Sequence, residues 1–268
     1  MEEIVQRSDQ PVQWDPRQYA RYTDERSRPF FDLVGQIEAE SPARVVDLGC
    51  GPGSQTLTLA DRWPAAEIHG IDSSPEMIER TRPAGNVTFA LGDVNDFSAS
   101  GVDVVLSNAL LQWVPAHRQL LQRWAGELNP GGWLAFQVPA NFDSPSHQLM
   151  REVAGSPRWR GRVGNVLRHD DAVAEPREYL DLLNESGLSA TVWQTEYLHV
   201  LPGADPVLQW VRGTGLRPIL AVLSGDEQAE FEREYSAALR QAYPPRPYGT
   251  VLPFRRTFAV ARKPGGRS

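Results

Sequence analysis

Three glycines and an aspartate follow a short apolar run near residue 45, and this spacing could build a ligand-binding loop. The run Arg44-Val45-Val46 leads directly into Asp47-Leu48-Gly49-Cys50-Gly51-Pro52-Gly53. Glycine permits tight turns and lets a ligand approach the backbone, because no Cβ atom stands in the way. The segment therefore predicts a turn between a buried strand and a helix, with a ligand held against the turn.

A nicotinamide dinucleotide site is the first alternative, because it also joins a strand to a helix through glycines. That site needs the pattern G-x-G-x-x-G, which brings a helix N-terminus to the pyrophosphate. Counting from Gly49 the sixth position is Ser54, and counting from Gly51 it is Thr56, so neither frame is complete. Pro52 also removes a backbone N–H that a phosphate would use. The loop favours a ligand without phosphate, and a plain turn with no ligand remains the structural alternative.

Polar residues also end the next three predicted strands. Asp72 lies 19 residues after Gly53, where a carboxylate can accept hydrogen bonds from both ribose hydroxyls of an adenosine ligand. It could equally cap the helix that begins near Ser74. Gly92-Asp93 offers an acceptor for an adenine amino group, or a plain turn, and Ser107-Asn108-Ala109 ends the fourth strand.

Short apolar runs alternate with helical patterns, which predicts an α/β fold with a parallel sheet and crossover helices. Strands are expected at Arg44–Leu48, Glu67–Ile71, Val87–Leu91, Val102–Ser107, Gly132–Val138, Ala190–Val200 and Phe254–Ala261. Helices are expected at Ser54–Trp63, Pro75–Arg82, Pro115–Leu128 and Pro176–Glu185.

Three segments fall outside this alternation: a helix at about Pro16–Ile37, an irregular stretch at Pro139–Glu175 and a helical stretch at Asp205–Tyr243. Insertions after the strands of an open α/β sheet usually build the ligand-facing side. We expect them to form a helical substrate cap (about 14–38, 139–175 and 204–243) over a cofactor-binding core (about 40–139), within one domain, 1–268.

Composition narrows the function classes. The formal net charge of −7 argues against a nucleic-acid partner, which requires a basic surface. Cys50 is the sole cysteine, so an internal disulfide and a thiolate metal cage are excluded. The N-terminus lacks the basic-then-apolar order of a signal peptide, and no run approaches the roughly 18 apolar residues of a membrane span. We expect a cytoplasmic protein with no membrane partner; its oligomeric state is not indicated.

Over about Arg44–Val138 the strand-end groups, in this order, resemble the class I methyltransferases. The resemblance implies a doubly wound, Rossmann-like sheet of roughly seven strands, the last antiparallel. It also implies S-adenosyl-L-methionine as cofactor, with S-adenosyl-L-homocysteine as product. Gly49, Gly51 and Gly53 would lie along the methionine part of the cofactor, and Asp47 would lie near its ammonium group. Asp72 would bind the ribose, and Asp93 would bind the adenine. Ser73, Val94 and Asn108 complete the predicted cofactor-binding set.

The resemblance extends beyond the core to the trans-aconitate 2-methyltransferases, over about Trp14–Ala261. It is carried by Trp14-Asp15-Pro16, Glu25-Arg26-Ser27-Arg28-Pro29, Leu111-Gln112-Trp113-Val114-Pro115, Gln137-Val138-Pro139-Ala140-Asn141, Gly215-Leu216-Arg217-Pro218 and Phe254-Arg255-Arg256-Thr257-Phe258. This family implies methyl transfer to one carboxylate of trans-aconitate, which gives a monomethyl ester. The small tricarboxylate would be the substrate that the protein binds besides the cofactor.

A carboxylate nucleophile needs no general base, since it is already ionised at pH 7. The five histidines are scattered without metal-ligand spacing, so no metal site is predicted. Catalysis would rest on positioning, which can contribute about 7–11 kcal/mol. Gln112 and Trp113 are the expected catalytic residues: an indole N–H can donate to a carboxylate and cannot take its proton. The alternative is that Trp113 only packs.

Arginines are the expected ligands of the other substrate carboxylates. Arg28, Arg217 and Arg256 lie in the family-like strings, and each could instead be an ordinary surface charge. A second possibility is the acid-free stretch Val153–Arg168, which holds Arg158, Arg160, Arg162 and Arg168. Two rival functions stay open: a methyltransferase for another small or carrier-bound acid, and a catalytically idle module that only binds S-adenosylmethionine.

Overall fold

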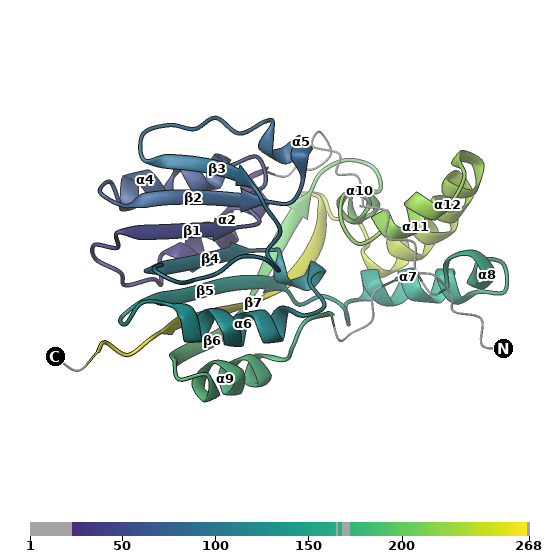
Figure 1. Ribbon diagram of the computed structural model, residues 1–268. Helices are drawn as coiled ribbons and strands as arrows, with labels where there is room; N and C mark the ends of the chain where they lie inside the picture. Colours follow the sequence, from purple (N-terminus) through teal and green to yellow (C-terminus); the bar gives the residue numbers. More distant parts are fainter. Residues whose placement is uncertain (1–22, 165, 168–171, 267–268) are drawn as a thin grey trace, which may run out of the picture. The chain divides into compact units, whose positions relative to one another are not determined.

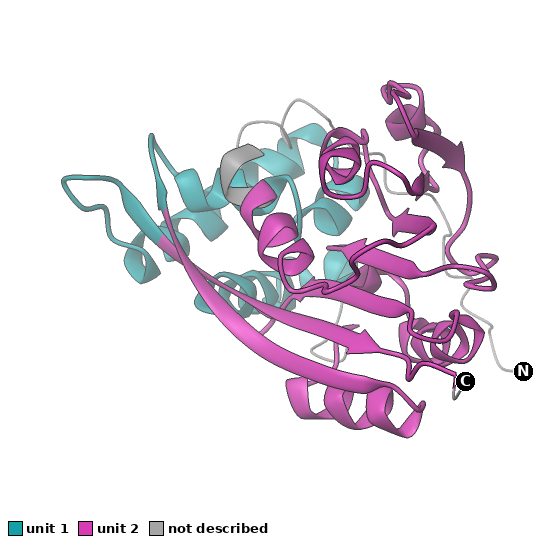
Figure 2. Ribbon diagram, turned by 90° about the vertical axis from the view of Figure 1, so that its left-hand side faces the viewer, with its two compact units in different colours: residues 1–21, 144–167, 200–251 teal, residues 22–143, 168–199, 252–268 magenta. Residues whose placement is uncertain are grey.

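The computed structural model describes residues 23–164, 166–167 and 172–266 (Figure 1). Its contacts divide the chain into two compact units (Figure 2). Among the described residues, unit 1 comprises 144–164, 166–167 and 200–251, and unit 2 comprises 23–143, 172–199 and 252–266. The parts predicted as a cap are therefore split: 204–243 lies in unit 1, whereas the described part of 14–38 lies in unit 2 with the sheet.

A seven-stranded sheet, in the order β3-β2-β1-β4-β5-β7-β6, forms the framework of unit 2 (Figure 1). Its strands are β1 (Arg44–Leu48), β2 (Glu67–Asp72), β3 (Val87–Leu91), β4 (Val104–Asn108), β5 (Trp133–Pro139), β6 (Ser189–Leu201) and β7 (Thr250–Arg262). β1 pairs in parallel with β2 and β4, β2 with β3, and β4 with β5, whereas β7 is antiparallel to β5. The predicted doubly wound, Rossmann-like α/β fold is confirmed. Because the parallel strands run the same way, their carboxyl ends share one edge of the sheet.

Helices cover both faces of this sheet, so its central strands are apolar almost throughout. Alternate residues of a strand point to opposite faces. One face, with Leu48 and Phe136, packs against α6 (His117–Glu127) and α9 (Pro176–Glu185). The other, with Leu106 and Phe258, packs against α2 (Thr23–Val34) and α4 (Leu59–Arg62).

Two of the predicted helices depart most from the expected bounds. The predicted helix at Ser54–Trp63 is divided into α3 (Ser54–Leu57) and α4 at Thr58, whose hydroxyl donates to the Gln55 carbonyl (2.6 Å). Such a side-chain bond competes with the helical backbone bonds. α5 (Pro75–Ile78) begins at the predicted proline and ends four residues before Arg82.

Unit 1 is helical, with α7 (Pro145–Gly155), α8 (Arg160–Val163), α10 (Pro206–Arg212), α11 (Arg217–Val222) and α12 (Gly225–Ala242). Two tyrosines fix the start of α7: the Tyr235 hydroxyl donates to the Ser146 carbonyl (2.7 Å), and the Tyr243 hydroxyl accepts from the Ser146 N–H (3.0 Å). The expectation of an irregular stretch over Pro139–Glu175 is wrong at α7. Pro145 at the first helical position was the available signal.

A buried hydrogen-bond chain links α6 to α9 inside unit 2. His117 is 3% exposed; its Nδ1 donates to the Val114 carbonyl (3.0 Å) and its Nε2 accepts from the Tyr179 hydroxyl (3.0 Å). That hydroxyl in turn accepts from the Ala174 N–H (3.1 Å). Burial lowers the pKa of His117, and the chain of donors and acceptors requires the neutral ring. His117 therefore has a structural role, since both ring nitrogens are hydrogen-bonded inside unit 2.

Removal of this hydroxyl should destabilise unit 2. Tyr179→Phe keeps the ring that packs edge-on against Phe136 and leaves the His117 Nε2 and the Ala174 N–H unpaired. We expect the free energy of unfolding in urea to fall by about 1–3 kcal/mol, the cost of a buried polar group that loses its partner. Tyr248→Phe, at a 67% exposed position, is the control and should change nothing. Equal stability of Tyr179→Phe and the unaltered protein would contradict this role.

Candidate active site

The loop after β1 is formed by three glycines in the left-handed region of backbone space. Their φ angles are 75° at Gly49, 56° at Gly51 and 80° at Gly53. Residues with a Cβ atom rarely adopt these values, so the spacing of the glycines sets the path of the chain. The Gly49 N–H donates to the Ile71 carbonyl (2.8 Å), which ties the loop to the end of β2.

The three glycines differ in what surrounds them. A Cβ atom at Gly53 would lie 2.5 Å from the ring of Phe89, and one at Gly49 would lie 2.9 Å from Leu110. A Cβ atom at Gly51 would meet nothing within 4 Å. Gly49 and Gly53 are therefore required by packing, whereas Gly51 leaves the backbone bare on its open side.

Asp72, at the end of β2, holds this loop in place. Its Oδ2 accepts from the Gly51 N–H and its Oδ1 from the Ser74 N–H, both at 2.9 Å. Ser74 itself is the N-cap of α5, because its hydroxyl accepts from the Met77 N–H (3.3 Å). A carboxylate has about four acceptor sites, so Asp72 can brace both turns and still accept from a ligand.

Asp47 lies beneath the same loop and is only 3% exposed. Its Oδ2 accepts from the Thr56 hydroxyl (2.6 Å). Burial raises its pKa to about 7; the Thr56 hydrogen bond acts in the opposite direction, and the charge of Asp72 adds to the rise. Two carboxyl groups within electrostatic reach of each other make this part of the sheet edge attractive to a cation.

The predicted adenine-side residues lie in the turn after β3. Asp93 is exposed, and its Oδ1 accepts from the N–H and the side-chain amide of Asn95 (2.8 and 2.7 Å). This is the turn arrangement that we considered as the alternative, and it uses one of the two carboxylate oxygens. Val94 packs against the core, and Ser73 is exposed between Asp72 and α5.

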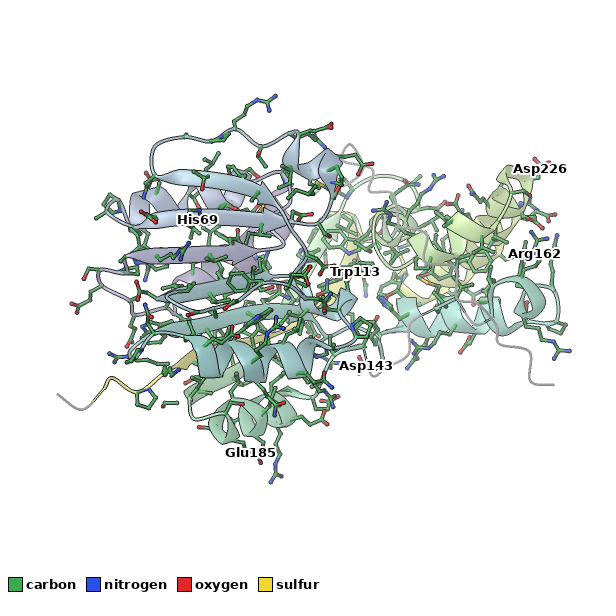
Figure 3. All side chains as sticks on the ribbon, viewed as in Figure 1. His69, Trp113, Asp143, Arg162, Glu185 and Asp226 are labelled. Atoms are coloured by element: carbon green, nitrogen blue, oxygen red, sulfur yellow. The ribbon has the colours of Figure 1, made fainter. Side chains whose placement is uncertain are left out.

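The end of β4 carries strained backbone and the predicted catalytic pair. Ala109, directly after Asn108, has a φ of 57°, unfavourable for a residue with a side chain. The Gln112 side chain, 7% exposed, donates from Nε2 to the Ala109 carbonyl (2.6 Å). Gln112 and Trp113 belong to a 3₁₀ turn, Leu111–Trp113, and Trp113 is half-buried at this edge of the sheet (Figure 3).

Three polar side chains from β4, β5 and β7 lie near one another: Asn108, Gln137 and Arg256, the last of which is the register partner of Pro139. Asn108 is the parallel partner of Gln137, and Gln137 Oε1 accepts from Arg256 Nη1 (3.0 Å). Gln137 is fully buried and Arg256 is 6% exposed, with its guanidinium 4.6 Å from the centre of the Phe254 ring. Neither Gln137 Nε2 nor Asn108 Oδ1 has a hydrogen-bond partner among the described residues.

The second predicted arginine, Arg28, approaches the same face of the sheet from α2. Its guanidinium lies 5.5 Å from the Tyr197 ring centre and 3.7 Å from Asp32, which accepts from the Tyr197 hydroxyl (2.6 Å). Burial and then Asp32 raise the pKa of Tyr197, and the charges of Arg256 and Arg28 oppose this rise. Arg28 and Arg256 therefore both lie within electrostatic reach of Tyr197, while Arg217 is the first residue of α11 in unit 1.

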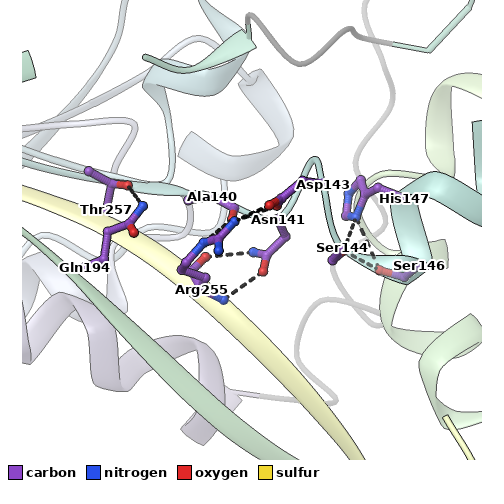
Figure 4. Close-up of polar contacts among 9 residues, drawn as sticks. All are labelled: Ala140, Asn141, Asp143, Ser144, Ser146, His147, Gln194, Arg255 and Thr257. Atoms are coloured by element: carbon purple, nitrogen blue, oxygen red, sulfur yellow. Dashed lines mark hydrogen bonds and ion pairs between the residues drawn. The ribbon is translucent and has the colours of Figure 1, made fainter. Parts of the chain in front are cut away.

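The neighbour Arg255 has a different task, because adjacent strand residues point to opposite faces. Its backbone N–H donates to Asn141 Oδ1 (2.7 Å) and its carbonyl accepts from Asn141 Nδ2 (2.8 Å) (Figure 4). Its guanidinium pairs with Asp143 (2.6 Å). Arg255 thus ties the end of β5 to β7.

Two arginines of the stretch Val153–Arg168 form ion pairs inside unit 1. Arg158 pairs with Glu230 and Glu234, and Arg162 pairs with Glu227 (2.7 Å), all from α12. Arg162, on α8, is labelled in Figure 3. Acids of α12 therefore compensate the charges of Arg158 and Arg162, which makes these two residues weaker candidates for substrate ligands than the acid-free sequence indicated. Arg168 lies outside the described residues.

Within the described ranges, no three His, Cys, Asp or Glu side chains are grouped closely enough to hold a metal ion. Among the helices of that part of the chain, none has both the length and the apolar character to span a membrane.

His147, at the start of α7, contacts the hydroxyls of Ser144 and Ser146 through Nδ1 (3.2 and 3.3 Å) (Figure 4).

Comparison with known proteins decides the family. Residues 45–132 match the model of a methyltransferase domain. The chain is 54% identical to the trans-aconitate 2-methyltransferase of Streptomyces coelicolor, over 94% of this chain and 88% of that protein. It belongs to the trans-aconitate 2-methyltransferase family. The Rhodococcus jostii member is 47% identical over 93% of this chain and 99% of its own length.

Solved structures share the fold of this methyltransferase. A putative methyltransferase of Haloferax volcanii, in complex with its Trm112 activator, has a TM-score of 0.54 and 20% identity and covers 94% of this chain and 95% of that one. The phosphoethanolamine N-methyltransferase 2 of Haemonchus contortus, solved with S-adenosyl-L-methionine, has a TM-score of 0.53 and 16% identity, over 88% of this chain and 52% of that chain.

S-adenosyl-L-methionine is the cofactor of this methyltransferase, and the residues present fit it. The ligand carries an ammonium and a sulfonium and no phosphate, which suits a loop with Asp47, Asp72 and Pro52. The bare backbone at Gly51 gives it room, because a Cβ atom there would have no protein atom within 4 Å.

Three residues beside the candidate site were not singled out in the sequence: Asp32, Gln137 and Tyr197. Gln137 had a signal, because it is the only residue of Trp133–Val138 that is neither apolar nor aromatic. Asp32 and Tyr197 are 165 positions apart, and only the fold brings them together.

Alanine substitutions should separate the two kinds of glycine in the methyltransferase loop. Gly51→Ala should weaken cofactor binding at least tenfold by titration calorimetry, because the methyl group occupies the open side of the loop, with a small loss of stability from the left-handed backbone. Gly53→Ala should lower the melting temperature much more, because its methyl group meets the Phe89 ring. The assignment of the open side would be wrong if Gly51→Ala bound the cofactor as tightly as the unaltered protein.

Proposed function

We propose that the chain transfers the methyl group of S-adenosylmethionine to one carboxylate of trans-aconitate and forms a monomethyl ester. The observation that carries the substrate class is the buried Arg256, held by Gln137 beside the end of β4, with Arg28 on the same face. An arginine fork can bind a carboxylate through two parallel hydrogen bonds. The names of the relatives support the choice of acid.

Each part of the cofactor has a proposed partner. Gly49, Gly51 and Gly53 line the methionine part, and the remaining acceptor sites of Asp72 take the ribose hydroxyls. The free side of the Asp93 turn, with Val94, borders the adenine, while Asp47 lies near the ammonium. Ser73 and Asn108 complete the contact set.

Bond formation then requires alignment and no proton transfer. The cofactor supplies a methyl group bound to a positively charged sulfur, and the substrate carboxylate is already ionised at neutral pH. His117 is unsuited to act as a base because both ring nitrogens are used inside unit 2. We assign the fixing of the reacting carboxylate to Trp113, with Gln112 as the brace that keeps the strained Ala109 turn in place.

Arg28 and Arg256 are the proposed ligands of the carboxylates that do not react, and Arg217 is proposed as a third. A cytoplasmic location and the absence of a nucleic-acid partner stay predictions. The same site chemistry would serve another small di- or tricarboxylate, which is the second candidate function.

Turnover of a panel of acids with labelled cofactor tests the proposal. Trans-aconitate should have the highest kcat/KM, EDTA should leave the rate unchanged, and Arg256→Ala should raise KM for trans-aconitate at least tenfold. Truncation of one member of a buried charged pair costs about 2–5 kcal/mol. Arg256→Lys should recover only part of the loss, because the planar fork is absent. Equal turnover of monocarboxylates, or wild-type KM in Arg256→Ala, would contradict the proposed substrate class.

Asp47→Asn should stabilise the protein and weaken cofactor binding at the same time. The pKa of Asp47 is raised from near 4 to about 7, so its ionisation costs stability as the pH rises through this range. The stability advantage of Asp47→Asn, measured by thermal melting, should therefore grow from about pH 4 to pH 7 and then level off. Cofactor affinity of the unaltered protein should fall as the pH drops below about 7, while that of Asp47→Asn should be weaker at pH 8, by roughly tenfold, and nearly independent of pH.

Asp96→Asn is a matched control in an exposed turn and should change neither quantity. Tighter or unchanged cofactor binding by Asp47→Asn at pH 8 would exclude Asp47 as the partner of the ammonium group.

A further inference from the structure

The side chain of Gln137 is a buried amide whose oxygen is hydrogen-bonded and whose nitrogen has no hydrogen-bond partner among the described residues. Its Oε1 accepts from Arg256 Nη1 at 3.0 Å, which fixes the orientation of the amide plane. Its Nε2 is buried without a hydrogen-bond partner among the described residues. Buried hydrogen-bond donors almost always have an acceptor, so a buried donor without one indicates that a ligand supplies the acceptor.

The position of Gln137 in the sheet places this donor at the candidate site. Gln137 is the register partner of Asn108, the last residue of β4, and its carbonyl accepts from the Ala109 N–H (2.9 Å). β4 is also the parallel neighbour of β1, which ends in the cofactor loop. The unpaired Nε2 therefore belongs to the strand ends that border the proposed site.

The chemistry of an amide distinguishes it from the acid that commonly faces a buried arginine. A carboxylate at position 137 would neutralise Arg256, whereas an amide oxygen orients the guanidinium and leaves its charge unchanged. The amide also adds an N–H donor directed away from Arg256. Gln137 thus combines an orienting contact to a cation with a second donor, which together suit a bound carboxylate.

We propose that Gln137 is a specificity-determining residue that binds a substrate carboxylate through Nε2 and positions Arg256 for the same carboxylate. The proposal rests on the proposed function, and it extends the carboxylate site from arginine alone to an arginine–amide pair. No bond to Gln137 forms or breaks; its effect is on the affinity for substrate charge.

The test replaces Nε2 with an oxygen. Gln137→Glu preserves the size of the side chain and its contact with Arg256, and it sets a negative charge against the substrate carboxylate. We expect kcat/KM for trans-aconitate to fall at least 100-fold, mostly through KM, with cofactor affinity within twofold of wild type. The loss should be smaller for a monocarboxylate analogue, because fewer charges are repelled. Gln194→Glu, whose amide donates to Thr257 on the same sheet, is the matched control and should keep wild-type kinetics.

Wild-type kcat/KM in Gln137→Glu, or an equal loss for the tricarboxylate and the monocarboxylate, would overturn the proposal; the first result would mean that Nε2 pairs within the protein, for example with Asn108. If Gln137→Glu fails to fold, an NMR titration of the unaltered protein tests the contact between Gln137 and the substrate. With ¹⁵N-labelled glutamine and saturating S-adenosylhomocysteine, trans-aconitate should shift the side-chain amide signal of Gln137 and leave that of Gln194 unchanged. An unshifted Gln137 signal at saturating acid would reject the contact.

The substrate range of the unaltered enzyme distinguishes failure of this proposal from failure of the proposed function. If wild type turns over a different small carboxylate and not trans-aconitate, the substrate assignment fails, while the Gln137→Glu comparison on that acid still tests the amide.

Discussion

The carboxylate of Asp72 is the contact on which the arrangement of the cofactor loop depends. Its two oxygens accept from the backbone of Gly51 and of Ser74, so one side chain ties the turn after β1 to the turn after β2. This is possible because parallel pairing brings the carboxyl ends of both strands to one edge. The left-handed Gly51 then needs no further support on its open side, which stays available to a ligand.

Charges of opposite sign occupy different places along this edge. Asp47 and Asp72 lie at β1 and β2, whereas Arg256 and Arg28 lie at β7 and on α2. In the proposed reaction a sulfonium and a carboxylate lose their charges together, so strong charges next to the reacting atoms would stabilise the reactants. In the proposed site the arginines bind the carboxylates that do not react, and a neutral indole contacts the carboxylate that does. This arrangement retains substrate affinity and does not stabilise the charges that are lost in the reaction.

Local patterns in the sequence were sufficient for the sheet and the cofactor loop. The apolar strand Arg44–Leu48 has the predicted bounds, and the glycines after it adopt the tight turn that their spacing indicated. Contacts between distant segments were not predictable in this way. The acids that neutralise Arg158 lie more than 70 positions away on α12, and the partner of Tyr197 lies on α2. Burial of Gln137 beside Arg256 likewise depends on how β5 and β7 pair.

The tandem arginines of β7 also bear on how reliably the strand finds its place during folding. Arg255 forms its ion pair with Asp143 on one face, and Arg256 is buried on the other. A slip of β7 by one residue along β5 would exchange the two faces. In either direction such a slip leaves one of the two places without an arginine: Asp143 would face Phe254, or Gln137 would face Thr257. The two contacts, Arg255 with Asp143 and Arg256 with Gln137, therefore favour the observed register of β7 although the two residues are chemically identical.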